Sequence, residues 1–161
     1  MTTPTLATQV TTQATIQATI PTKSYTLASV AALLIGSFAY AIGLYNADMA
    51  LNEKGYYLIV LLFGLFSMVS VQKAVRDERE GIQTSKIYTR ICWASSAIAI
   101  SLLIIGLYNA QLLLSEKGFY AMAYTLSIFS VVVMQKNIRD KACANKTDTG
   151  LIQDTDIELE E

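Results

Sequence analysis

The residues of this sequence that could do chemistry are few, and most fall in two matched polar sets. The first set is Asn46, Glu53 and Lys54, and the second is Asn109, Glu116 and Lys117. Together, amide, carboxylate and ammonium groups can hold a small polar solute through hydrogen bonds and charge. The same residue types also end helices and form turns. Two readings therefore stay open: a shared polar site, or a pair of helix-ending turns.

Enzymatic chemistry has little support in the composition. The chain has no histidine, which removes the commonest general base and metal ligand. Its two cysteines, Cys92 and Cys143, show no metal or redox spacing. No ionisable residue lies deep in an apolar run, where a proton-coupled pump would need a carboxylate. We therefore expect no enzymatic activity, no cofactor and no metal site.

Four apolar runs must position these polar sets, at residues 25–45, 55–71, 91–114 and 118–134. The first run has 21 residues, and as a helix it rises about 31 Å, enough to cross a hydrocarbon core of ~30 Å. The second and fourth runs have 17 residues, at the lower limit for a span. Charged residues are only 16% of the chain. The sequence therefore predicts an all-α integral membrane protein with four transmembrane helices.

The two halves of the chain are copies of each other. A shift of 63 residues aligns them without a gap, and 17 of the 35 positions from Gly43 to Asp77 are then identical. The identities include Asn, Glu, Lys, Gln, Arg and Asp, which chance matching of apolar segments does not readily produce. Each copy contains two spans, so the copies are parallel repeats of one helical hairpin. We expect repeats at 25–80 and 88–141, a disordered arm at 1–24 and a disordered acidic tail at 142–161.

Positive charge predicts the orientation. The N-terminal arm, the central loop expected at 73–90 and the C-terminal tail hold ten of the 12 basic residues, and the hairpin loops hold Lys54 and Lys117. The positive-inside rule then places both termini and the central loop in the cytoplasm. Aromatic belts agree with this. The outer belt is expected to comprise Tyr45, Tyr56, Tyr57, Tyr108, Phe119 and Tyr120, and the inner belt Tyr25, Tyr88 and Trp93.

Small residues recur every four positions in the first run, as in the stripe of Ala28, Ala32 and Gly36 and the stripe of Ala39, Gly43 and Ala47. Such stripes let helix backbones approach closely in lipid. The alternative is that Ala and Gly are simply common in membrane helices.

A second shared motif, QKxxRD, ends each copy. Its basic members are Lys73, Arg76, Lys136 and Arg139. One reading is contact with acidic lipid headgroups or a protein partner. The other is that these residues only set the topology, with Lys73 pairing with Asp77 and Lys136 with Asp140 at helical spacing.

The repeated stretches resemble the YiaA/YiaB family of bacterial inner-membrane proteins, which is built from a two-helix domain. The residues that carry the resemblance are GLYNADMALNEKGYY, GLFSMVSVQKAVRD, GLYNAQLLLSEKGFY and VVVMQKNIRD. They cover roughly residues 24–140. The resemblance implies four spans in a bacterial inner membrane, and it implies no catalytic or binding residues.

These observations favour a small multi-pass inner-membrane protein that acts through helix or lipid contacts as an accessory or scaffold protein. Its expected partners are membrane lipids and either a second copy of the chain or another membrane protein. A net charge of −1 gives no reason to expect nucleic acid. The alternative is a small-solute transporter or channel with the two Asn/Glu/Lys sets at its outer mouth.

Overall fold

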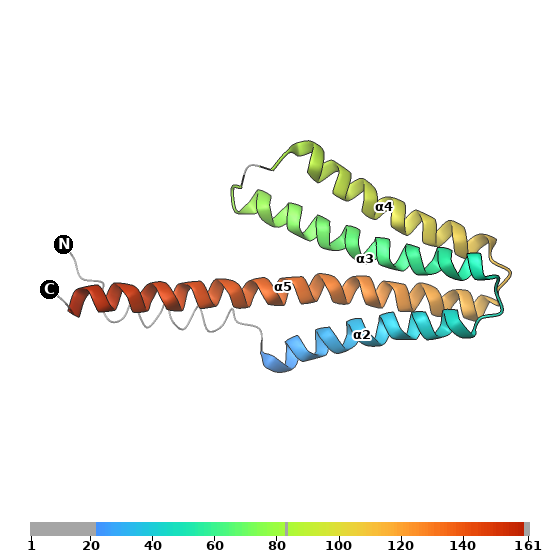
Figure 1. Cartoon of the computed structure of the whole chain (residues 1–161), viewed down its shortest axis with the longest axis horizontal. Coiled ribbons are helices and arrows are strands. Elements are labelled where there is room, and N and C mark those ends of the chain that lie inside the picture. Colours follow the sequence, from blue (N-terminus) through green and yellow to red (C-terminus); the bar gives the residue numbers. More distant parts are fainter. Residues whose placement is uncertain (1–21, 83, 160–161) are drawn as a thin grey trace. The chain divides into compact units, whose positions relative to one another are not determined.

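A computed structural model describes the backbone of residues 22–82 and 84–159 and the side chains up to residue 142. It contains four helices, α2 (Lys23–Asn46), α3 (Leu51–Arg79), α4 (Lys86–Asn109) and α5 (Leu114–Leu159) (Figure 1). Each is long and apolar enough to cross a membrane. The expected all-α membrane fold with four spans is confirmed. The expected arm at 1–24 lies outside the described residues, except that α2 already begins at Lys23.

The helices are longer than the apolar runs that predicted them. The 17-residue runs lie within α3 and α5, whose described starts are Leu51 and Leu114. The expected loop at 73–90 shrinks to residues 80–85 because charged residues continue α3 to Arg79. Gly81 ends that helix with a φ of +70°, a left-handed conformation that glycine adopts without strain. The sequence predicts a disordered tail at 142–161, but α5 is helical to Leu159. Residues 142–161 contain no proline and only one glycine that could interrupt a helix.

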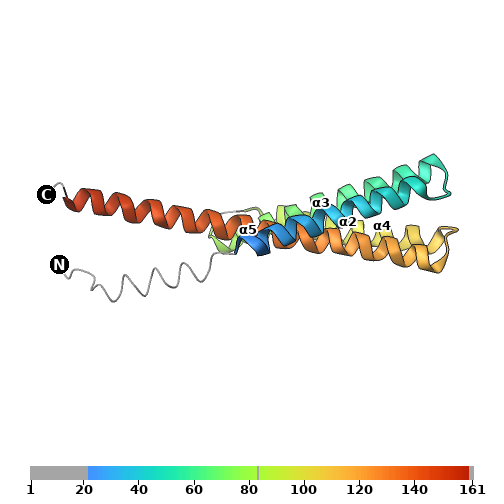
Figure 2. The ribbon, with the colours of Figure 1, turned by 90° about the horizontal axis from the view of Figure 1, so that it is seen from below.

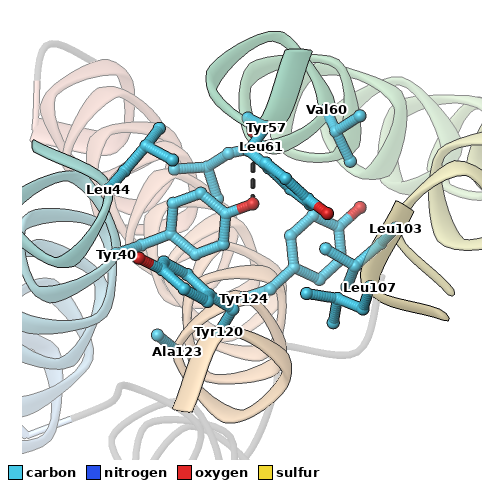
Figure 3. Packing of buried hydrophobic residues seen from close by; sticks show 10 residues of the cluster. All are labelled: Tyr40, Leu44, Tyr57, Val60, Leu61, Leu103, Leu107, Tyr120, Ala123 and Tyr124. Carbon is cyan, nitrogen blue, oxygen red and sulfur yellow. Dashed lines mark hydrogen bonds between the residues drawn. The ribbon is translucent and has the colours of Figure 1, made fainter. Parts of the chain in front are cut away.

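Two compact units make up the chain, residues 28–135 and a second unit of residues 1–27 and 136–161. In the first unit the four spans form a bundle. Both hairpin loops lie at the same end of this bundle, as parallel repeats require (Figure 2). Viewed along the helices, α3 and α5 face each other, with α2 and α4 on either side (Figure 3).

The buried core at the loop end of the bundle is built from the repeat itself. Ten residues converge there (Figure 3): Tyr40, Leu44, Tyr57, Val60, Leu61, Leu103, Leu107, Tyr120, Ala123 and Tyr124. They form five pairs, and the members of every pair are 63 positions apart. The duplication therefore gave both hairpins the same inward face, and the two faces close on each other.

The closest contacts between helices also occur in repeat-related pairs. A Cβ atom on Gly43 of α2 would lie 2.6 Å from Phe119 of α5, and one on Gly106 of α4 would lie 2.7 Å from Tyr56 of α3. Gly43 and Gly106 are equivalent in the repeat, as are Tyr56 and Phe119. The first helix of each hairpin thus packs against the second helix of the other. The glycines of the small-residue stripes therefore pack against another helix of the same chain.

The surface of the bundle is more aliphatic than its interior. Large apolar side chains such as Phe66, Ile98 and Ile104 are exposed, whereas serines such as Ser67 and Ser127 are buried and hydrogen-bond to helix carbonyls. In lipid, apolar surface needs no burial, and buried hydroxyl groups bond within the helices. This distribution fits a protein whose solvent is the bilayer.

Candidate functional site

The two glutamates of the repeated polar sets begin the second helix of each hairpin. Glu53 Oε2 accepts a hydrogen bond from the Ala50 N–H at 3.2 Å, and Glu116 Oε2 accepts one from the Leu113 N–H at 2.9 Å. The first N–H groups of a helix have no partner within the helix. Each carboxylate therefore satisfies one of these donors and places negative charge at the positive end of the helix dipole.

The two asparagines and the two lysines end the first helix of each hairpin. Asn46 Nδ2 donates to the Ile42 carbonyl at 3.0 Å, and Lys54 Nζ donates to the Tyr45 carbonyl at 2.9 Å. The Tyr45 carbonyl is one of the last of α2, which lack intrahelical partners, and a lysine ammonium is a strong donor to it. The Ile42 carbonyl lies within the hydrogen-bonded part of α2, which continues to the bond from the Ala47 N–H to the Gly43 carbonyl.

The second hairpin repeats these bonds. Asn109 Nδ2 donates to the Ile105 carbonyl at 2.9 Å, and Lys117 Nζ donates to the Tyr108 carbonyl at 3.3 Å. All six predicted residues are thus engaged at helix ends, with matching partners in both copies. This gives a physical reason for the repeat of Glu and Lys in kind, because an unpaired N–H at a helix start needs an acceptor and an unpaired carbonyl at a helix end needs a donor.

The bundle also brings polar residues of opposite repeats together in two pockets at its loop end. We name the larger one hairpin pocket A, which has a volume of about 1030 Å³, and the smaller one hairpin pocket B, which has a volume of about 300 Å³. Glu53 and Asn109 line pocket A, and their repeat equivalents Glu116 and Asn46 line pocket B. Each pocket thus combines the glutamate of one repeat with the asparagine of the other, because the first helix of each hairpin packs against the second helix of the other. Lys54 and Lys117 do not line either pocket.

The two pockets differ in chemistry. Pocket A carries the carboxylates of Asp48 and Glu53 with the amides of Asn52, Asn109 and Gln111. Among the described residues that line it, none is a lysine or an arginine. Pocket B has Phe119 and Ser115 at the positions that Tyr56 and Asn52 occupy in pocket A. Pocket A therefore suits a solute that is cationic or rich in hydrogen-bond donors.

Buried tyrosines form the inner wall of both pockets. Tyr57 lines pocket A and Tyr120 lines pocket B, and their rings are stacked with centroids 6.2 Å apart. Tyr40 packs edge-on against Tyr120 and donates from its hydroxyl to the Tyr57 carbonyl at 3.2 Å. Beyond them, the hydroxyl of Tyr124 is buried without a hydrogen-bond partner in the described structure.

Tyr57 and Tyr120 correct the expected outer aromatic belt, since both are about 4% exposed. Neighbouring residues on a helix point about 100° apart, so only one ring of Tyr56–Tyr57 or of Phe119–Tyr120 can turn away from the core. Tyr57 shares its helix face with the small residues Gly64 and Ser67, and that spacing is the signal in the sequence that indicated burial. Of the other belt members, Tyr45 and Tyr108 are more than 80% exposed, and Tyr56 and Phe119 are 36% and 44% exposed.

The QKxxRD motifs contain different ion pairs from those expected. Asp77 pairs with its neighbour Arg76 at 2.9 Å, and Arg76 also lies 3.8 Å from Glu80. In the second copy Arg139 pairs with Asp140 at 3.4 Å. The long arginine side chain can reach back to the adjacent carboxylate, whereas Lys73 and Lys136 are exposed.

No metal site is present in the described part of the chain, where no three His, Cys, Asp or Glu side chains gather closely enough to hold an ion.

A family described as the yiaA/B two helix domain matches residues 25–77 and 88–140. Inner membrane protein YiaA of Escherichia coli (strain K12) is 50% identical over 131 residues, which are 81% of this chain and 90% of that protein. Inner membrane protein YiaB of the same organism is 34% identical over 106 residues, 65% of this chain and 90% of that protein.

A shorter match is to the uncharacterized membrane protein YubF of Bacillus subtilis (strain 168), which is 40% identical over 60 residues, 37% of this chain and 69% of that protein. No solved structure matches the chain.

Proposed function

Because the chain belongs to the yiaA/B two helix domain family, we propose that it is a non-enzymatic protein of the bacterial inner membrane that acts through helix and lipid contacts as an accessory or scaffold subunit. The observation that carries this proposal is the use of the repeated polar residues. All six are bonded to helix-end backbone groups. The duplicated identities are accounted for by architecture, so the surface of the bundle is where the protein meets other molecules.

The proposed orientation places both termini and the central loop in the cytoplasm. Ten of the 12 basic residues lie in those segments or in the helix ends that adjoin them, and positive charge beside the spans favours the cytoplasmic side. The hairpin loops and both hairpin pockets then face the opposite side. The proposed contact surface lies between these levels and consists of exposed apolar residues such as Phe66, Ile98 and Phe129.

Photo-crosslinking in intact membranes tests the accessory role. A photoreactive residue is placed in turn at Phe66, Ile98 and Phe129, and at the buried control position Val60, which is 2% exposed. We expect a covalent product with another polypeptide, a second copy or a partner, from at least one exposed position and none from Val60. Monomer alone at every exposed position would contradict the proposal.

A second candidate function rests on hairpin pocket A. Its volume of about 1030 Å³ and its lining of carboxylates and amides fit the entrance of a small-solute transporter. Uptake into proteoliposomes is the measurement, with a panel of cationic and neutral solutes. If this function holds, some solute is taken up, and Glu53→Gln lowers the rate more than Glu116→Gln, because Glu116 lines the smaller pocket. Absence of uptake across the panel would exclude it.

A further inference from the structure

A third pocket lies at the other end of the bundle, where α3 ends and α4 begins. It has a volume of about 570 Å³, and we name it the central-loop pocket. Its charged residues are Lys86 and Arg90 of α4 and Glu78 of α3, and its apolar residues include Ile82 and Trp93. The alignment of the two copies does not reveal it, because the pocket is completed by Gly81, Ile82 and Thr84 of the segment that joins the repeats.

One face of α4 supplies half of the lining residues. Thr89, Arg90 and Trp93 lie three, four and seven positions after Lys86, so all four project from the same side of the helix. Two cations, a hydroxyl group and an indole ring thus lie in line. The ion pairs of the described residues do not include Lys86, Arg90 or Glu78. All three charges are available to a ligand.

The pocket lies at headgroup level. Trp93 is 57% exposed, and tryptophan favours the boundary between hydrocarbon and water. Ile87 and Ile91, on the same turns of α4, are 68% and 57% exposed, and exposed aliphatic residues in a spanning helix face lipid. The charges of Lys86 and Arg90 are one to two turns closer to the helix start than Trp93. A ligand in this pocket is therefore flanked by acyl chains on one side and water on the other.

From this arrangement we propose that the central-loop pocket binds the headgroup of an ethanolamine phospholipid. The lipid phosphate lies between Lys86 and Arg90, and the guanidinium of Arg90 can donate two parallel hydrogen bonds to it. The primary ammonium of the headgroup donates to the carboxylate of Glu78. Trp93 packs against the glycerol region. This assignment deepens the lipid contacts of the proposed function and rests on the membrane location proposed there.

Charge and hydrogen bonding together select this headgroup over its alternatives. A choline headgroup has the same charges but no N–H to donate to Glu78. A glycerol headgroup has the phosphate but no cation to oppose Glu78, so its net negative charge leaves that carboxylate unpaired. A free phosphate lacks both the ammonium and the acyl chains.

Native mass spectrometry of the purified full-length chain tests the assignment, with phosphatidylethanolamine, phosphatidylcholine and phosphatidylglycerol added separately in detergent. Inorganic phosphate is a fourth arm. We expect ethanolamine lipid to bind tightest. Lys86→Ala with Arg90→Ala should weaken its binding about 30-fold, because each interfacial cation contributes roughly fivefold. Glu78→Gln should remove the preference for ethanolamine over choline lipid while phosphate-dependent binding persists.

The matched control is Lys23→Ala with Arg79→Ala, which removes the same charge from residues that do not line the pocket. It should bind as the unmodified chain does, and all variants should keep the same thermal unfolding midpoint. Equal binding by the pocket variant and the control would overturn the site. Equal or tighter binding of choline lipid, glycerol lipid or free phosphate would overturn the ethanolamine assignment.

The lipid-binding test and the crosslinking test can fail separately. Loss of the lipid preference with partner crosslinks intact would remove only this pocket. Missing crosslinks with the lipid preference intact would remove only the accessory role.

Discussion

Two side chains in each hairpin satisfy backbone groups that its two helices leave unpaired. Lys54 bonds to a carbonyl at the end of α2, and Glu53 bonds to an N–H at the start of α3, while Asn46 adds a bond to a carbonyl within the last turn of α2. Near a bilayer, water is a poorer substitute for such partners than it is around a soluble protein, and an unpaired polar group is costly. This demand accounts for the lysine and the glutamate, because a turn alone would accept many other residues.

Removal of the carboxylate cap should destabilise each hairpin. Glu53→Ala and Glu116→Ala should each lower the free energy of unfolding by about 1 kcal/mol, the usual net value of one hydrogen bond. Unfolding in detergent micelles, followed by helical circular dichroism, measures the change. The control is Asn52→Ala, an exposed neighbour in the same turn. A loss from Asn52→Ala as large as that from Glu53→Ala would contradict the capping role.

At the residue scale, sequence alone indicated the polar sets, and it left open whether they bind a solute or cap helices. The hydrogen bonds explain why: the partners are main-chain carbonyls and amides, which every residue carries and no motif reveals. The burial of Tyr57 and Tyr120 was missed for a related reason. Aromatic residues with a hydroxyl group suit both a membrane interface and a core, so residue type alone does not decide between the two, and the spacing of Tyr57 to Gly64 and Ser67 was the signal left unused.

The helices approach most closely where glycine removes a side chain. Gly64 of α3 lies directly against the phenol ring of Tyr124 in α5, and a Cβ atom there would overlap the Tyr124 hydroxyl. Gly55 lies on the same helix, and a Cβ atom on it would have nothing within 4 Å. The two glycines of α3 thus have different roles, the first in packing and the second at an open position.

Alanine at these two positions should act in opposite directions. Gly64→Ala forces Tyr124 to move, and overpacking of this kind costs about 1–3 kcal/mol. Gly55→Ala should be neutral or stabilise by up to about 1 kcal/mol, because alanine favours a helix. Thermal unfolding of both variants in the same detergent compares them. If Gly64→Ala proved as stable as Gly55→Ala, the close approach of α3 and α5 would be wrong.

At the element scale, sequence predicted the number and type of the helices, since four apolar runs of membrane length leave little choice. It placed their ends poorly. Residues 72–79 are mostly polar, so hydropathy assigned them to a loop, yet charged residues favour a helix well and α3 continues through them. The turn at Gly81 is what ends the helix.

In the bundle of residues 28–135 the two hairpins pack through equivalent faces, and the first helix of each contacts the second helix of the other. We call this arrangement the reciprocal bundle. Gly43 meets Phe119 as Gly106 meets Tyr56, and the buried core consists of repeat-related pairs. This packing places Glu53 beside Asn109 and Glu116 beside Asn46. The repeat was visible in the sequence. The crossing of the pairs was not, because the alignment of two copies says nothing about which helix of one packs on which helix of the other.

The most direct test of the reciprocal bundle is a disulfide between α2 and α5. The hydroxyl oxygens of Ser37 and Ser127 are 3.4 Å apart, so cysteines at these positions need only a small adjustment to bond at ~2.05 Å. The pair is made with Cys92 and Cys143 replaced by alanine and with a protease site inserted in the loop at 80–85. The control pair joins Ser37 to Ser101, an exposed residue of α4. After oxidation in membranes and cleavage of the loop, the two halves should stay joined in the Ser37–Ser127 pair alone. Separated halves, or linkage between different chains, would contradict the reciprocal bundle.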